Sequence, residues 1–159
     1  MVLSGESYNA VNGEKSGIWS TGQCFHSNSE TGPYWTAELV ESTTITKVVL
    51  YNRLDFGIGK LQDYSIYIGD SYDHTQNSLC GDSSAYSYSN TIYCNMKGRY
   101  LTVELTDTTA NLQLCEVEAF GTSSYTLPSI DSENIMLNAT VSASSTYSSY
   151  SADRAIDGD

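Results

Sequence analysis

The chain has 159 residues, 40% of them hydrophobic, which is enough for the core of about one domain. Seven Lys and Arg stand against 19 Asp and Glu, and the net charge of -12 argues against a nucleic acid or an anionic membrane as partner, because both need a cationic face. The apolar stretches are shorter than the roughly 18 residues of a membrane span, and the residues after Met1 form no hydrophobic secretory run.

β-branched and aromatic residues predict strands in four places along the chain. These are Ile45–Asn52, Asp63–Gly69, Arg99–Leu105 and Leu112–Phe120. Turn-forming residues predict connections at 53–60, 69–73, 80–84 and 106–111. Since no stretch of about 12 residues has a helical period, the sequence predicts an all-β fold, either a sandwich or a jelly roll.

The composition changes after Gly121. Residues 122–132 are polar, contain one of the two prolines and are predicted to be a linker, and a strand-like segment follows from Asn134 to Val141. The chain also repeats itself, because Asn9–Glu14 matches Arg154–Asp159 about one domain length later. This offset predicts a tandem array, in which the chain starts inside one repeat and ends at the same point of the next.

The four cysteines stand at positions 24, 80, 94 and 115. They form no CxxC pair and the chain has only two histidines, which disfavours a tetrahedral zinc site. An even number of widely spaced cysteines favours two disulfides in an oxidising compartment, with three possible pairings. Four buried free thiols in a cytosolic protein are the alternative.

One set of polar residues has a characteristic spacing. His26 is followed after 26 residues by Arg53-Leu54-Asp55, and after four more by Lys60. A His, an Arg, an Asp and a cation at these offsets form the sugar signature of the F-type lectins, or fucolectins, which the chain resembles. The resemblance covers nearly the whole chain in a permuted order, with 134–159 as the usual opening of the domain and 9–121 as the rest. It implies a discoidin-like jelly roll, with circular permutation as an open alternative.

The resemblance implies that His26, Arg53 and Lys60 hold the hydroxyls and ring oxygen of a terminal L-fucose. The chemistry suits a neutral sugar, because Arg brings five donors in a rigid fork and Lys three on a flexible stem. Asp55 is expected to orient the cation or the loop without touching the sugar, and to offset the nearby positive charges. Taken singly, each of these residues would more commonly be solvated or structural. One site is expected to bind at micromolar affinity or weaker.

The apolar side of the site departs from the family. Well-known members carry two adjacent disulfide-bonded cysteines where this chain has Phe56 and Gly57. Phe56 is expected to pack under the methyl group of fucose, and Trp19, seven residues before His26, is expected to face the sugar. Ordinary core packing is the alternative for both aromatic residues. The changed loop leaves the preferred glycan open.

The resemblance further implies the disulfides Cys24–Cys115 and Cys80–Cys94, and a structural calcium ion near the first of them. Calcium takes six to eight oxygen ligands, many of them carbonyls. The candidate ligands are Asn9, Asn12, Glu14, Gln23, Cys115 and Glu116. Asn12 stands where the family usually has Asp, so one charge is lost, and an exposed strand carboxylate is the alternative for Glu116.

The permuted order divides the chain into three parts. Residues 1–121 form a lectin domain without its usual first strand, 122–132 a linker, and 133–159 the opening strand of the next repeat or a permuted first strand of the same domain. That last part folds back in cis, pairs with a second chain in a strand-swapped dimer, or stays loose. The 11-residue linker reaches about 35 Å when extended and allows the first arrangement. An unfilled sheet edge promotes aggregation, which argues against the third.

The predicted function is that of a secreted, calcium-containing, non-catalytic lectin for fucosylated glycans. Repeats would offset weak single sites by avidity, as in gamete-recognition lectins of the bindin type or agglutinins of innate immunity, two groups that the chain resembles. The alternative is a discoidin-like adhesion module that binds protein or lipid and has lost sugar binding. An enzyme is disfavoured, because a glycosidase needs two carboxylates about 5–10 Å apart and the matched site has only Asp55.

Overall fold

The computed structural model describes residues 7–55, 61–84, 87–122 and 135–146. The strands in these ranges are β1 (Phe25–His26), β2 (Glu30–Thr31), β3 (Tyr34–Tyr51), β4 (Tyr64–Gly69), β5 (Ser78–Ser83), β6 (Ser89–Leu105), β7 (Thr109–Ala110), β8 (Gln113–Leu114), β9 (Glu116–Thr122) and β10 (Thr140–Ala143). Short 3-10 turns are η1 (Ser7–Val11), η2 (Trp19–Thr21), η4 (His74–Gln76) and η5 (Ile135–Asn138). Among the described residues, no helix is long and apolar enough to cross a membrane.

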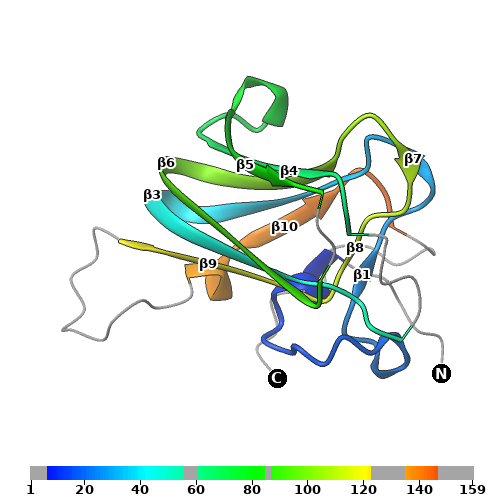
Figure 1. Ribbon diagram of the computed structural model, residues 1–159. Helices are drawn as coiled ribbons and strands as arrows, with labels where there is room; N and C mark the ends of the chain where they lie inside the picture. The colour runs from blue at the N-terminus through cyan, green and yellow to red at the C-terminus, as the bar shows by residue number, and fades with distance from the viewer. Residues whose placement is uncertain (1–6, 56–60, 85–86, 123–134, 147–159) are drawn as a thin grey trace.

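Two long antiparallel strands, β3 and β6, take part in both layers of the molecule (Figure 1). Their register shifts between Glu38 and Thr43 and between Ile45 and Lys47, and such irregularities bend a strand. The first part of β3 lies in one layer, in the order β10-β3-β6-β4-β5, and its second part forms the other layer with β6 and β9. The predicted all-β sandwich is therefore confirmed.

The core lies between the two layers. Strand β3 contributes buried side chains along both of its halves, with runs of three buried residues at 35–37 and 48–50. The largest fully buried side chains are Trp35, Tyr64, Phe25, Ile45, Leu50, Leu61, Ile66, Ile68, Leu101, Leu105, Leu112 and Leu114. The indole N–H of Trp35 donates to the carbonyl of Ser7 at 2.8 Å, so η1 is fastened to the core by a buried polar group that has its partner.

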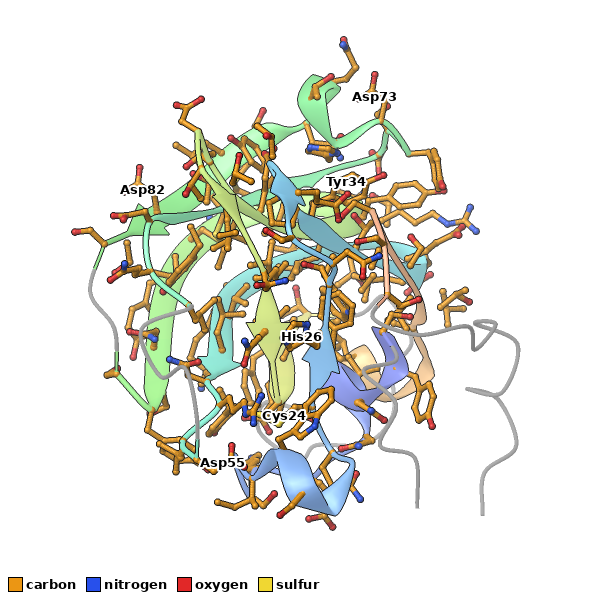
Figure 2. All side chains as sticks on the ribbon, turned by 90° about the vertical axis from the view of Figure 1, so that its right-hand side faces the viewer. Cys24, His26, Tyr34, Asp55, Asp73 and Asp82 are labelled. Carbon is orange, nitrogen blue, oxygen red and sulfur yellow. A yellow bond between two sulfur atoms is a disulfide. The ribbon has the colours of Figure 1, made fainter. Side chains whose placement is uncertain are left out.

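Both disulfides have the pairing that the family resemblance implied. Cys24 is bonded to Cys115, which ties the residue before β1 to the residue between β8 and β9. Cys80 is bonded to Cys94, which ties β5 to β6. The alternative of four free thiols is wrong. The first bridge lies at the end of the sandwich where β1 pairs with β8 (Figure 2).

Strand β10 lies on the same chain's own sheet. Strand β10 pairs antiparallel with β3, from Thr140 opposite Glu38 to Ala143 opposite Trp35, and Met136 of η5 is buried in the core. The predicted linker lies outside the described residues except for Thr122, which ends β9. Whether residues 133–159 belong to this domain or to a next repeat stays a prediction.

Candidate functional site

Four of the predicted sugar-binding residues meet at one end of the sandwich. Trp19 comes from η2 and His26 from β1, and their ring centroids lie 5.5 Å apart in an edge-to-face arrangement. The Cζ atom of Arg53 lies 5.0 Å from the centroid of the Trp19 ring. Asp55 lies beside Arg53, at the same end of the molecule as His26 and Cys24 (Figure 2). The other two predicted residues, Phe56 and Lys60, lie outside the described ranges.

Arg53 is a nearly buried cation with a fixed orientation. Its side chain is 11% exposed, and its Nε donates to Oδ1 of Asp55 at 2.6 Å. Partial burial by itself raises the pKa of Asp55. Hydrogen bonds from Arg53 and from the backbone of Trp19 outweigh that effect, so the pKa lies below its usual value. The arrangement gives a charged donor group held by an ionised carboxylate next to an indole ring.

His26 is held by the residue that follows it. Its Nδ1 lies 2.6 Å from the carbonyl oxygen of Ser27, and because a carbonyl only accepts, Nδ1 carries the proton. In the neutral ring, Nε2 is then an acceptor. The same carbonyl accepts from the side chain of Asn111 at 3.2 Å, and the hydroxyl of Ser27 accepts from the N–H of Leu112 at 2.9 Å. These supporting residues have no signature in the sequence, because each contact joins positions about 85 apart.

The loop that carries Trp19 is fastened to the loop that carries Arg53. The N–H of Leu54 donates to the carbonyl of Gly17 at 2.7 Å. Gly17 has a φ of +66°, and a Cβ there would lie 2.9 Å from Cγ of Leu54 and 3.1 Å from the carbonyl oxygen of Asn52. Only glycine fits this close approach in a left-handed conformation. Trp19 itself is partly exposed and lies outside the buried core cluster.

The predicted calcium ligands lie around the Cys24–Cys115 disulfide. The Nδ2 atom of Asn9 donates to the carbonyl of Cys24 at 3.2 Å, and that of Asn12 donates to Oε1 of Gln23 at 2.5 Å. The N–H of Glu14 donates to Oδ1 of Asn12 at 2.8 Å. The first loop and the residues before β1 therefore form one hydrogen-bonded unit.

Glu116 is the buried carboxylate of this unit. Its Oε2 accepts from the N–H of Gly13 at 3.0 Å, while Oε1 has no hydrogen-bond partner among the residues that the structure describes. The residue is fully buried, so the alternative of an exposed strand carboxylate is wrong. Burial raises the pKa of Glu116 to about 8. No three His, Cys, Asp or Glu side chains gather in a metal-binding group within the described ranges, so an ion here would depend mainly on amide and backbone oxygens.

Comparisons with known proteins point to sugar-binding domains. Residues 9–103 match the family of NedA-like, galactose-binding domains. The fucolectin of Anguilla anguilla is 32% identical over 124 residues, which cover 74% of this chain and 77% of the relative. Fucolectin-1 of Anguilla japonica is 35% identical over 115 residues, which cover 69% of this chain and 64% of the relative.

Solved structures of two similar proteins share the fold. A fucolectin from the serum of striped bass, Morone saxatilis, superposes with a TM-score of 0.71 at 33% identity, over 76% of this chain and 43% of that chain. A fucose binding module of Streptococcus pneumoniae superposes with a TM-score of 0.66 at 27% identity, over 75% of this chain and 87% of that module. The chain thus spans less than two thirds of the Anguilla japonica fucolectin and of the striped bass lectin.

Proposed function

Because the chain belongs to the F-type lectin (fucolectin) family, we propose that it binds the terminal L-fucose of glycans through His26, Arg53 and Lys60. Proteins of this family are lectins and not enzymes. One observation carries the proposal. Arg53 is distant in sequence from Trp19 and His26, yet its guanidinium lies against the Trp19 ring, which in turn contacts the His26 ring at the end of the sandwich.

Each residue of the cluster has a role that its chemistry supports. Arg53, oriented by Asp55, donates to sugar oxygens, and Lys60 adds donors on a longer stem. His26 offers Nε2 as an acceptor for a sugar hydroxyl, since Nδ1 is engaged with Ser27. Trp19 and Phe56 supply the apolar surface for the methyl group. A neutral sugar that exchanges water for a few such hydrogen bonds binds weakly, at micromolar affinity or weaker.

We further infer a structural calcium site at Asn9, Asn12, Glu14, Gln23, Cys115 and Glu116. The residues fit an ion that prefers oxygen, because Oε1 of Glu116 is buried with no partner in the described part of the chain. The side-chain oxygens of Asn12 and Gln23 lie in the same hydrogen-bonded unit. A buried carboxylate is costly unless it is paired or coordinates a metal. The ion would supply the positive charge that compensates the buried Glu116 carboxylate, and it would hold the loop that leads to Trp19.

The biological setting is proposed from the same features. Two disulfides are typical of an oxidising, extracellular compartment, and the striped bass relative comes from serum. Fucosylated glycans are therefore the proposed partners of a secreted protein in cell or gamete recognition or in innate immunity. The repeated Asn9–Glu14 motif supports a tandem array, in which avidity offsets weak single sites.

A calorimetric titration of L-fucose into the chain, with calcium present, tests the proposed function. We expect saturable binding that His26→Ala abolishes. His74→Ala is the matched control, because the chain has only two histidines and His74 packs against Tyr34 and Tyr67 outside the cluster. The absence of any binding heat at millimolar fucose, measured on folded protein, would overturn the proposal. The discoidin-like adhesion module for protein or lipid would then be the better interpretation.

A further inference from the structure

The C-terminal segment makes direct hydrogen bonds to the loop that follows His26. The N–H of Asn28 donates to the hydroxyl oxygen of Ser145 at 3.0 Å. That hydroxyl donates in turn to Oε1 of Glu30, the first residue of β2. Ser144 donates to the same oxygen at 2.7 Å. Residues more than 110 positions apart in the sequence are thus joined at positions two and four residues after His26.

From this contact we propose that Ser145 is a positioning residue for His26, so that the docked C-terminal strand is part of the sugar site. The proposal rests on the proposed function. Ser145 acts through Asn28 and needs no contact with sugar. Its effect is to hold the loop between β1 and β2 in the position in which the His26 ring contacts the Trp19 ring.

The loop between β1 and β2 is held by two sets of hydrogen bonds, and Ser145 takes part in one of them. On one side, Ser27 is hydrogen-bonded through its backbone and side chain to Asn111 and Leu112. On the other side, Asn28 is hydrogen-bonded to Ser145. Strands β1 and β2 are only two residues long, so their own ladders fix little of the loop. Each added hydrogen bond therefore restricts the position of His26 appreciably.

Glu30 makes this support stronger than an ordinary contact between a serine and a backbone N–H. A hydroxyl that donates to a carboxylate forms a charge-assisted hydrogen bond, and it is also polarised as an acceptor. The Oε1 atom of Glu30 accepts a hydrogen bond from both serine hydroxyls. Ser144 is fixed independently, because its N–H donates to the carbonyl of Tyr34 at 3.0 Å and continues the pairing of β10 with β3. The position of Ser145 is therefore set by the docked strand.

Variants of the full chain, titrated with L-fucose in calcium, test the proposal. Ser145→Ala should weaken the affinity about two- to tenfold, the range that corresponds to one lost hydrogen bond. Ser145→Thr keeps the hydroxyl and should restore most of the affinity. Ser142→Ala is the matched control, because Ser142 lies in β10, three residues before Ser145, and pairs with Thr36 of β3. Glu30→Gln keeps an acceptor without the charge and should give an intermediate loss.

A readout on His26 itself separates positioning from a merely structural role. We expect the NMR signals of the His26 ring to shift in Ser145→Ala and to stay in place in Ser142→Ala, while the two variants have similar melting temperatures. Wild-type affinity and unshifted ring signals in Ser145→Ala would overturn the inference. If the wild-type chain binds no fucose, the proposed function fails. The ring signals still decide whether Ser145 positions His26.

Discussion

At the scale of single residues, the ion pair of Asp55 and Arg53 is the contact that orients the cation of the proposed sugar site. Asp55→Asn keeps the shape of the side chain and removes its charge. We expect the affinity for L-fucose to fall roughly tenfold or more, since a hydrogen bond between charged groups contributes about 1.5–3 kcal/mol. Stability should also fall, because the Arg53 side chain is only 11% exposed and would lose its charged partner. Calorimetry and a melting curve measure both effects.

The control for this variant is Asp107→Asn. Asp107 is exposed and has a φ of +54°, a conformation that Asn tolerates as well as Asp. Asp107 lies outside the cluster of Trp19, His26 and Arg53, so the affinity of the Asp107→Asn variant for fucose should equal that of the wild type. An Asp55→Asn protein that binds fucose as tightly as Asp107→Asn would show that Arg53 is oriented without the carboxylate.

The same ion pair predicts how Asp55 titrates. Because the folded pKa lies below the ordinary Asp value of about 3.9, Asp55 remains ionised while the pH falls to that value. The contribution of the pair to stability is complete above the ordinary pKa and is lost as the pH falls through the folded one. A carboxyl NMR titration measures this, and the pKa of Asp55 should rise in Arg53→Gln. An unchanged pKa in that variant would contradict the assignment.

Residues of the site differ in whether a sequence can reveal them. The resemblance to the F-type lectin signature predicted that His26, Arg53 and Asp55 belong together, and the structure brings them to one end of the sandwich. Asn111 and Ser145 could not be found in this way, since they are ordinary polar residues whose contacts appear only after distant loops have met. The roles of Phe56 and Lys60 remain predictions.

At the scale of the elements, Gly17 joins the Trp19 loop to the end of β3. Gly17→Ala places a methyl group against Leu54 and the Asn52 carbonyl in a left-handed conformation. We expect a loss of about 2–4 kcal/mol of stability, because overpacking adds to the backbone cost. Fucose affinity should fall as well, since Trp19 is displaced.

Gly13→Ala is the matched control. Gly13 also has a positive φ, +84°, but no atom of the described residues lies within 4 Å of a Cβ there. It should therefore show only the backbone cost of about 1–2 kcal/mol. Melting temperatures of the two variants, measured without added calcium, give the comparison. Equal losses would mean that the contact of Gly17 with Leu54 is not tight.

The proposed calcium site predicts a second effect on these loops. A ligand present at 100 times its dissociation constant stabilises the folded state by about 2.7 kcal/mol, or roughly 5–10 °C in a domain of this size. Calcium should raise the melting temperature of the wild type and of Glu38→Gln by several degrees, and that of Glu116→Gln very little. Differential scanning calorimetry with calcium or a chelator measures this. An equal rise in all three proteins would place the ion elsewhere.

Two elements differ from their prediction, each for its own physical reason. Strand β3 begins at Tyr34, well before the predicted start at Ile45. The earlier start was not predicted because the first half of the strand has no β-branched run. The predicted turn at 80–84 is largely strand β5. Gly81 suggested a turn, but a Cβ there would lie 2.7 Å from the Ile92 side chain, so a glycine permits the close approach of β5 and β6.

At the scale of the whole molecule, the central question is which chain supplies β10. Residues 123–134 connect β9 to η5, and this many residues can span about 40 Å. A covalent connection of this length gives the strand an effective concentration on the order of millimolar. A second copy at micromolar concentration cannot compete with it. We therefore expect pairing within one chain in dilute solution, with strand exchange between copies only at much higher concentration.

A cysteine pair placed across β10 and β3 tests this expectation. Thr140 lies opposite Glu38, so Thr140→Cys with Glu38→Cys brings two thiols within reach of a disulfide. Oxidised at micromolar concentration, the double variant should run as a cross-linked monomer on a non-reducing gel, and each single variant as an unlinked one. A covalent dimer would show that a second chain donates the strand. Each sugar site would then contain Ser145 of its partner, and fucose affinity would depend on protein concentration.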